Sequence, residues 1–289
     1  MEAKLARILA SLILLLLVLV VGLDQWQVRR GEASVFSVLW SFGRTARADG
    51  PKSVGSPEGV SASPRQAPTG ARVAVIIDDL GYREDLYETL KSFRRPLTLS
   101  VLPGLPVSKK IAAEAPAWGM EVLLHLPMEP YRYPELDPGP GALLMAMPPE
   151  ELQGLTRKYL GQLPTVVGVN SHMGSKMTEY RDRMRPVLSV VKERKLLFVD
   201  SHTSNMSVAY DEARTLGVRA ARRHVLLDLE FDESSERRQF EEVTRRVERG
   251  KETIAIGHGH PLTLRLLEEY LPKWDAAGAR IAPVSQLVD

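Results

Sequence analysis

From residue 71 onward, short apolar runs alternate with amphipathic segments. Val73–Ile77 is a continuous run rich in β-branched residues, typical of a strand buried on both faces. Glu236–Arg249 has the amphipathic pattern of a helix and ends at Gly250. The same criteria predict strands at 97–102, 121–126, 166–170, 196–200, 224–229 and 253–257, with a short last strand at 280–283, and helices at 83–93, 108–118, 149–160, 182–194, 208–216 and 261–277.

Strands that alternate with helices indicate a mainly parallel sheet with helices packed outside it. The number of units favours a distorted or incomplete (β/α) barrel of about seven parallel strands. An open sheet of five or six strands is the alternative, and periodicity alone does not separate the two. The barrel domain is predicted to span residues 71–289.

The residues before this domain predict a membrane attachment. The run from Leu5 to Leu23 is apolar except for Arg7 and is long enough to cross a bilayer. Lys4 and Arg7 precede the uncharged part, so the positive-inside rule places the domain on the periplasmic or extracellular side of the cytoplasmic membrane. We predict a single-pass anchor at 1–23 rather than a cleaved signal peptide, because no small-x-small cleavage site follows closely. Residues 24–70, rich in Pro, Ser and Gly towards their end, are predicted to be a flexible linker.

Composition removes several classes of function. The formal net charge is only +2 and the basic pairs are scattered, which argues against a nucleic-acid surface. The chain has no cysteine, so disulfides, thiolate zinc sites and a cysteine nucleophile are excluded. Any metal site must therefore use histidine and carboxylate ligands.

Polar residues with metal-binding or acid–base chemistry follow several of the predicted strands. Asp78 and Asp79 end the first strand, and His125 lies in the third. The other strand ends carry His172, His202, His258 and His260. Active sites of parallel α/β folds lie at the carboxyl ends of strands. Neutral imidazole and carboxylate bind zinc and similar divalent ions, which activate water, so the pattern predicts a metal-dependent hydrolase.

Five segments of the domain resemble the divergent polysaccharide deacetylase family, a branch of the carbohydrate esterases with a distorted (β/α) barrel. They read IIDDLG at 76–81, HLPMEP at 125–130, GVNSHMGS at 168–175, FVDS at 198–201 and GHGHP at 257–261. The resemblance implies that Asp78 is the general base, Asp79 binds the metal ion and His258 donates a proton. Asp200, in the fourth segment, is added to the predicted catalytic set.

The third metal ligand is where the chain departs from the family pattern. Family members take two ligands from a His-x-x-x-His segment after the third strand, but here the segment runs from His125 to Glu129. We predict His172 as the third ligand because it lies at the end of the next strand, and Glu129 is the alternative. The predicted substrate-binding residues are Glu129, Lys176, His202, His260 and Tyr131, of which Lys176 would orient an anionic group and Tyr131 would stack on a sugar.

We therefore expect a zinc-dependent carbohydrate deacetylase that acts on N-acetylated cell-envelope or extracellular polysaccharide. Two alternatives stay open. One is a catalytically degenerate binding or scaffolding module, suggested by the incomplete motif and the tether. The other is a different metal hydrolase, for phosphate esters or for glycosidic bonds, in which Asp78 and Asp200 would be paired carboxylates.

Overall fold

One sheet of parallel strands forms the centre of the protein, seen in a computed structural model that describes residues 70–230 and 232–289. The order across the sheet is β6-β5-β4-β3-β2-β1-β8-β7, and β9 pairs with the start of β1. All pairings between the named strands are parallel. The strands are β1 (Arg72–Leu80), β2 (Thr98–Val101), β3 (Glu121–Met128), β4 (Gly168–Met173), β5 (Leu197–Asp200), β6 (Ala220–Arg222), β7 (Val225–Leu226), β8 (Thr253–His258) and β9 (Arg280–Ile281).

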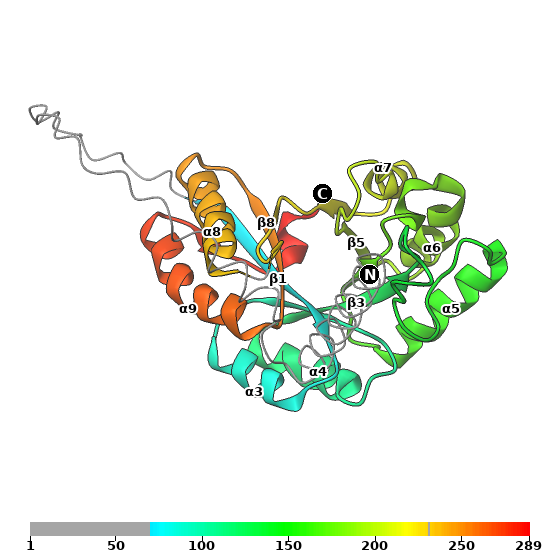
Figure 1. The fold of residues 1–289 in the computed structure, drawn as a ribbon, viewed down its shortest axis with the longest axis horizontal. Coiled ribbons are helices and arrows are strands. Elements are labelled where there is room, and N and C mark those ends of the chain that lie inside the picture. Colours follow the sequence, from blue (N-terminus) through cyan, green and yellow to red (C-terminus); the bar gives the residue numbers. More distant parts are fainter. Residues whose placement is uncertain (1–69, 231) are drawn as a thin grey trace, which may run out of the picture. The chain divides into compact units, whose positions relative to one another are not determined.

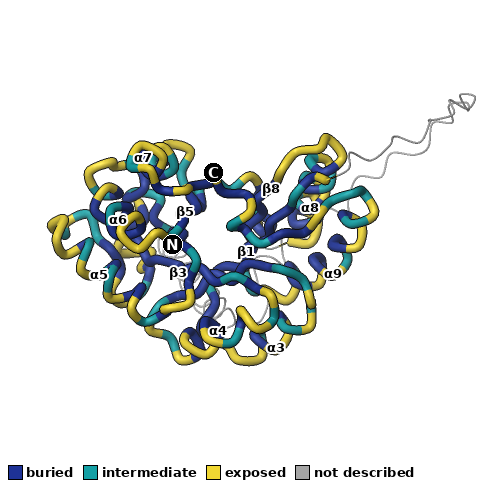
Figure 2. Tube along the Cα trace, turned by 180° about the vertical axis from the view of Figure 1, so that it is seen from behind, coloured by how far each residue is buried: buried dark blue, intermediate teal, exposed yellow. Residues whose placement is uncertain are grey.

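Helices cover the outer face of the curled sheet (Figure 1), and they expose the sides that face away from it (Figure 2). The α-helices are α3 (Glu84–Ser92), α4 (Ser108–Glu114), α5 (Pro149–Gln162), α6 (Arg181–Glu193), α7 (Ala209–Thr215), α8 (Glu233–Glu248) and α9 (Pro261–Ala276). Local sequence explains their starts. Asp232, for example, caps α8 by accepting hydrogen bonds from the backbone N–H groups of Ser234 and Ser235.

Side chains alternate between the two faces along each strand, so the buried apolar residues form two clusters, one on each face of the sheet. In β1, Val73, Val75 and Ile77 belong to the larger cluster that packs against the helices. Ala74 and Ile76 belong to a smaller cluster on the concave side of the sheet. Because successive side chains of a strand point to opposite faces, both faces of the sheet are buried, as the continuous apolar runs predicted.

The sheet closes on itself only through one short stretch of chain. β6 and β7 are consecutive in sequence, yet β6 pairs with β5 and β7 pairs with β8, at opposite edges of the sheet. The parallel, curled α/β fold is therefore confirmed, but the single sixth strand predicted at 224–229 is wrong. The polar residues between the two short strands concealed the first of them, since the apolar run marks only the second half of the stretch.

The C-terminal segment fills the concave side at the end where the strands begin. The 3₁₀ helix η3 (Val284–Leu287) belongs to the concave core. The backbone N–H of Val284 donates to Thr98 Oγ1 at the start of β2 (3.1 Å), and that of Ser285 donates to the carboxylate of Glu121 at the start of β3 (3.0 Å). The opposite end, where the strands finish, is left for the cavity described below.

The N-terminal predictions concern residues that the structure does not describe. The membrane helix predicted at 1–23 and all of the predicted linker except Gly70 lie outside the described residues, so both stay predictions. Among residues 70–230 and 232–289, no helix combines the length and the apolar character needed to cross a membrane.

Candidate metal and catalytic site

Strand alternation brings the predicted site residues to the concave side. Asp78, His125 and His258 each stand two residues after an apolar side chain of the concave core, so they face the same side of the sheet. β1 and β8 are neighbours, and Asp78 pairs in register with His258, whereas β3 is separated from β1 by β2. His172 follows Asn170 by two residues on β4 and pairs in register with Pro127 of β3.

A local distortion turns Asp79 to the same side as Asp78. In a regular strand, neighbouring side chains would point to opposite faces. Here the register between β1 and β2 shifts between Ile77 and Leu80, and Asp79 has a positive φ of 60°. Two consecutive carboxylates therefore line one cavity, and the positive φ marks a strained backbone of the kind found at functional sites.

Three side chains form a compact ligand set. Asp79 Oδ1 lies 3.0 Å from His125 Nε2 and 2.8 Å from His172 Nδ1, and the two histidine nitrogens lie 3.2 Å apart. Ligand atoms around a tetrahedral zinc ion are about 3.3 Å apart, given bonds of about 2.0–2.1 Å. The set has the chemistry and spacing that suit a divalent ion, with one carboxylate and two imidazoles.

Asn170 orients both His125 and Asp78. Its Oδ1 accepts from Ser100 Oγ (2.6 Å) and from His125 Nδ1 (3.0 Å), while its Nδ2 donates to Asp78 Oδ1 (2.9 Å). These bonds place the proton of His125 on Nδ1, which leaves Nε2 free to bind a cation when that nitrogen is deprotonated. Asn170 was quoted in the sequence pattern but given no role.

Asp79 and His125 stabilise each other's charged forms. Burial opposes ionisation of Asp79, but hydrogen bonds from His125 and His172 hold the pKa of its carboxyl far below the usual range. Burial likewise disfavours a charged His125, yet the charges of Asp78 and Asp79 raise the pKa of its imidazole. In the absence of a cation the site thus attracts a proton, which a divalent ion would displace on binding.

A His–Asp pair lies beside the ligand set. His258 Nδ1 is 2.9 Å from Asp228 Oδ1, and the backbone N–H of His258 donates to Asp228 Oδ2 (2.6 Å). Nε2 of His258 lies 3.8 Å from Asp79 Oδ2. Burial alone would lower the pKa of His258, but the hydrogen bond and charge of Asp228 raise it to about 9. Asp228 was missed, although it too stands at the end of a predicted apolar strand.

A cavity of about 390 Å³ opens over these groups. Asp78, Asp79 and the predicted residue His202 line it, as does Arg223, which the sequence analysis had counted only among scattered basic pairs. Asp200 does not line it. It shares the strand face of Phe198, which packs towards the helices, and it is fully buried there, accepting hydrogen bonds from Ser207 Oγ and the backbone N–H of His202.

The other predicted substrate-binding residues lie outside this cavity. Glu129 forms an ion pair with Lys176 (2.6 Å) and accepts from the backbone N–H of Met145, so it is engaged away from the ligand set. Tyr131 is exposed and hydrogen-bonds Glu179. His260 lines a neighbouring hollow of about 320 Å³, which shares Asp79 and His258 with the cavity.

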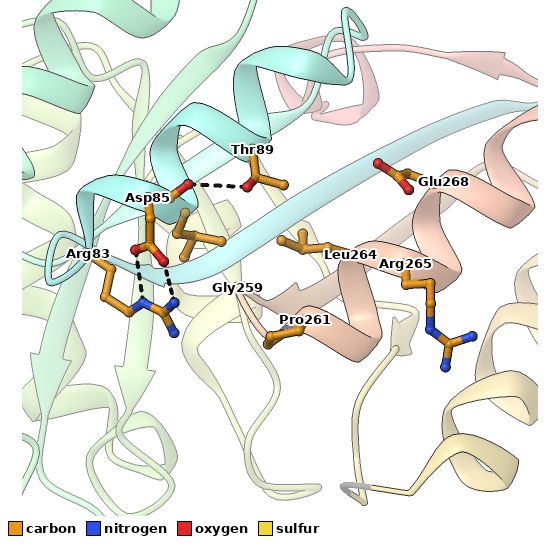
Figure 3. A pocket seen from close by; sticks show the side chains of 9 residues that line it. Arg83, Asp85, Thr89, Gly259, Pro261, Leu264, Arg265 and Glu268 are labelled. Carbon is orange, nitrogen blue, oxygen red and sulfur yellow. Dashed lines mark hydrogen bonds and ion pairs between the residues drawn. The ribbon is translucent and has the colours of Figure 1, made fainter. Parts of the chain in front are cut away.

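A further hollow, of about 310 Å³, lies between α3 and α9 (Figure 3). Both of its arginines are engaged by carboxylates: Arg83 pairs with Asp85 inside it, and Arg265 pairs with Glu233. It contains no histidine, and none of the ligand set lines it. The chemistry of the described residues is therefore concentrated at the cavity above the ligand set.

The chain belongs to the divergent polysaccharide deacetylase family, whose model matches residues 75–288. This confirms the resemblance read from the motifs. The uncharacterized protein YibQ of Escherichia coli K12 is 35% identical over 198 residues, covering 68% of this chain and 61% of that protein, so the match spans less than two thirds of YibQ. An uncharacterized protein of Haemophilus influenzae is 28% identical over 198 residues, covering 68% and 70%. The crystal structure of the uncharacterized protein ATU2773 from Agrobacterium tumefaciens C58 superposes with a TM-score of 0.70 at 25% identity, covering 76% and 90%.

Proposed function

We propose that this protein is a metal-dependent deacetylase that removes acetyl groups from an N-acetylated polysaccharide of the cell envelope. The observation that carries the proposal is the convergence of Asp79, His125 and His172 beside Asp78 and the His258–Asp228 pair. The class of substrate comes from the family description. The proposed location, outside the cytoplasm on an N-terminal anchor, depends on the sequence of residues 1–23 alone.

The chain's own side chains supply the remaining chemistry. A zinc ion held by Asp79, His125 and His172 would activate water and polarise the acetyl carbonyl. Asp78 is buried beside that ligand set, so its carboxylate is placed to accept the proton of the attacking water. His258, protonated and held by Asp228, faces the cavity from the other side and would donate a proton to the leaving amine.

The position of His172 removes the main argument for a catalytically degenerate module. The sequence raised that alternative because Glu129 stands where the family pattern has histidine. In the structure Glu129 is paired with Lys176, and His172 from the neighbouring strand completes the set instead. Under this proposal the chain supplies three ligands without the His-x-x-x-His segment, and three protein ligands would leave a coordination position for water.

Metal content and acetate release from N-acetylated chito-oligomers test the proposal. Asp79→Asn should lower zinc affinity at least 10–100-fold, the loss associated with outer-shell changes alone. Asp78→Asn should keep the metal and lower kcat by roughly 10²–10⁴-fold, the usual contribution of a general base. Asp182→Asn, at the exposed start of α6, is the matched control and should change neither quantity.

Two outcomes would reject the proposal in different ways. Wild-type protein that binds no divalent metal and releases no acetate would contradict both the metal site and the activity. Protein that binds zinc through Asp79 but releases no acetate from any N-acetylated glycan would favour the binding or scaffolding module.

A further inference from the structure

Arg223 presents unused hydrogen-bond donors at the wall of the cavity. Its Nε donates to the carbonyl of Ser201 (2.6 Å) and its Nη2 to the carbonyl of His202 (2.8 Å). A guanidinium has five N–H donors in a planar fork. Two are used here, so three have no acceptor among residues 70–230 and 232–289. The two carbonyl bonds hold the group in place while leaving one edge of the fork open.

The charge of Arg223 is also not neutralised by an ion pair. No carboxylate of the described residues forms a salt bridge with it, whereas its neighbour Arg222 approaches both Asp200 and Asp211 at 3.9 Å. Burial lowers the pKa of the Arg223 guanidinium, and the charges of Asp200 and Asp78 only partly offset this. A partly buried cation without a bonded counter-ion is costly, and an anionic ligand group would relieve that cost.

Other polar groups of the same wall are unpaired. Ser171 and Ser201 line the cavity, and their hydroxyl oxygens have no hydrogen-bond partner in the part of the chain that the structure describes. Both residues are at least nine-tenths buried. Burial lowers the pKa of His202, so its imidazole is neutral at pH 7 and can both donate and accept. Native proteins rarely leave several buried polar groups of one wall without partners, so their presence here indicates a ligand.

We propose that Arg223, with Ser201 and His202, forms an anion subsite that binds a carboxylate carried by the polysaccharide, so that the substrate is an acidic glycan. This inference rests on the proposed function, because the bound glycan is a substrate only if the protein is a deacetylase. The planar fork of arginine matches the two oxygens of a carboxylate, which favours this anion over a hydroxyl group. The carboxylates Asp78 and Asp79 in the same cavity are engaged by Asn170 and by the two ligand histidines, so they do not satisfy Arg223.

Two oligosaccharides that differ only in charge test the subsite. One is chitotetraose, and the other is the β-1,4-linked tetramer of N-acetylglucosaminuronic acid, in which a carboxylate replaces each C6 hydroxymethyl group. Isothermal titration calorimetry of wild-type protein at low salt should show roughly ten- to hundredfold tighter binding of the acidic tetramer, as expected for charge-assisted hydrogen bonds. This preference should shrink only in part at 0.5 M salt, because salt screens a partly buried ionic contact less than an exposed one.

Three variants assign the preference to Arg223. Arg223→Gln should abolish it, and Arg223→Lys should keep part of it as a point charge without the planar fork. Arg222→Gln removes an adjacent arginine that does not line the cavity, and it should leave the preference unchanged. Circular dichroism of each variant reports whether the protein still folds.

The outcomes are decisive for the subsite. Equal affinity of wild-type protein for the two tetramers, or no measurable binding of the acidic one, would overturn the proposal without the need for any variant. A preference that survives Arg223→Gln would overturn it as well. Acetate release is recorded separately: a charge preference in binding without acetate release would count against the deacetylase activity and not against the anion subsite.

Discussion

Glu236 on α8 provides a test of how burial and the charge of Asp228 act on a neighbouring carboxyl group. Its side chain is fully buried, its Oε1 has no partner among the described residues, and its Oε2 lies 3.2 Å from Thr263 Oγ1. Thr263 in turn donates to Asp228 (3.0 Å), the partner of His258. Burial, and then the charge of Asp228, raise the pKa of Glu236 from 4.5 to about 7. Asp232 raises it further, while Thr263 and Arg265 act in the opposite direction.

The size and sign of the effect on stability follow from linkage. Below pH 4.5 the carboxyl is protonated in both the folded and the unfolded chain. Between pH 4.5 and about 7 the unfolded chain loses this proton while the folded chain keeps it, so the free energy of unfolding falls as the pH rises through this range. At about 1.4 kcal/mol per pKa unit, the full loss is roughly 3 kcal/mol, of which roughly 2–3 kcal/mol falls between pH 5 and pH 8.

Glu236→Gln isolates this contribution because glutamine resembles the protonated acid but cannot ionise. Urea unfolding followed by circular dichroism at pH 5 and pH 8 should show the variant gaining roughly 2–3 kcal/mol on wild-type protein between the two values. Glu241→Gln, an exposed glutamate on the same helix, should show no comparable gain. If the wild-type and Glu236→Gln stabilities change in parallel with pH, Glu236 is ionised in the folded protein and the reasoning fails.

Two further predictions concern positioning and packing. Asp228→Asn should lower kcat for acetate release roughly 10²-fold, the lower end expected for a general acid, because His258 loses the partner that orients it; an unchanged kcat with normal zinc content would refute this. Gly168→Ala should destabilise the protein by about 1–3 kcal/mol in thermal or urea unfolding, because its Cβ would lie 2.7 Å from the backbone oxygen of Leu197 on the neighbouring strand. Gly154→Ala, where a Cβ meets nothing within 4 Å, is the control and should not destabilise the helix.

Periodicity predicted most of the fold because both faces of the parallel sheet are apolar. The run Val73–Ile77, for example, appears inside β1, which continues to Asp78 in its pairing with β8 and to Leu80 in its pairing with β2. The split between β6 and β7 could not be read in this way. Two- and three-residue strands carry no periodicity of their own, and their identity depends on which sheet edge each one meets.

The rule that active-site residues lie at the carboxyl ends of parallel strands located the site, but it could not tell which strand-end residues face the cavity. It placed Asp78, His125 and Asp200 together, although side-chain alternation, counted from the observed strand boundaries, turns Asp200 towards the helices. Arg223 was overlooked for a different reason. Its role depends on two backbone carbonyls of another strand end, and no local pattern in the sequence records that contact.

The position of η3 has a consequence for how a long polymer could be handled. Because Val284 and its neighbours fill the concave side of the sheet where the strands start, the cavity over the ligand set does not continue through to that end of the sheet. Under the proposed function, a glycan would therefore lie across the rim of the cavity and present its acetylated residue from the side, without threading through the sheet.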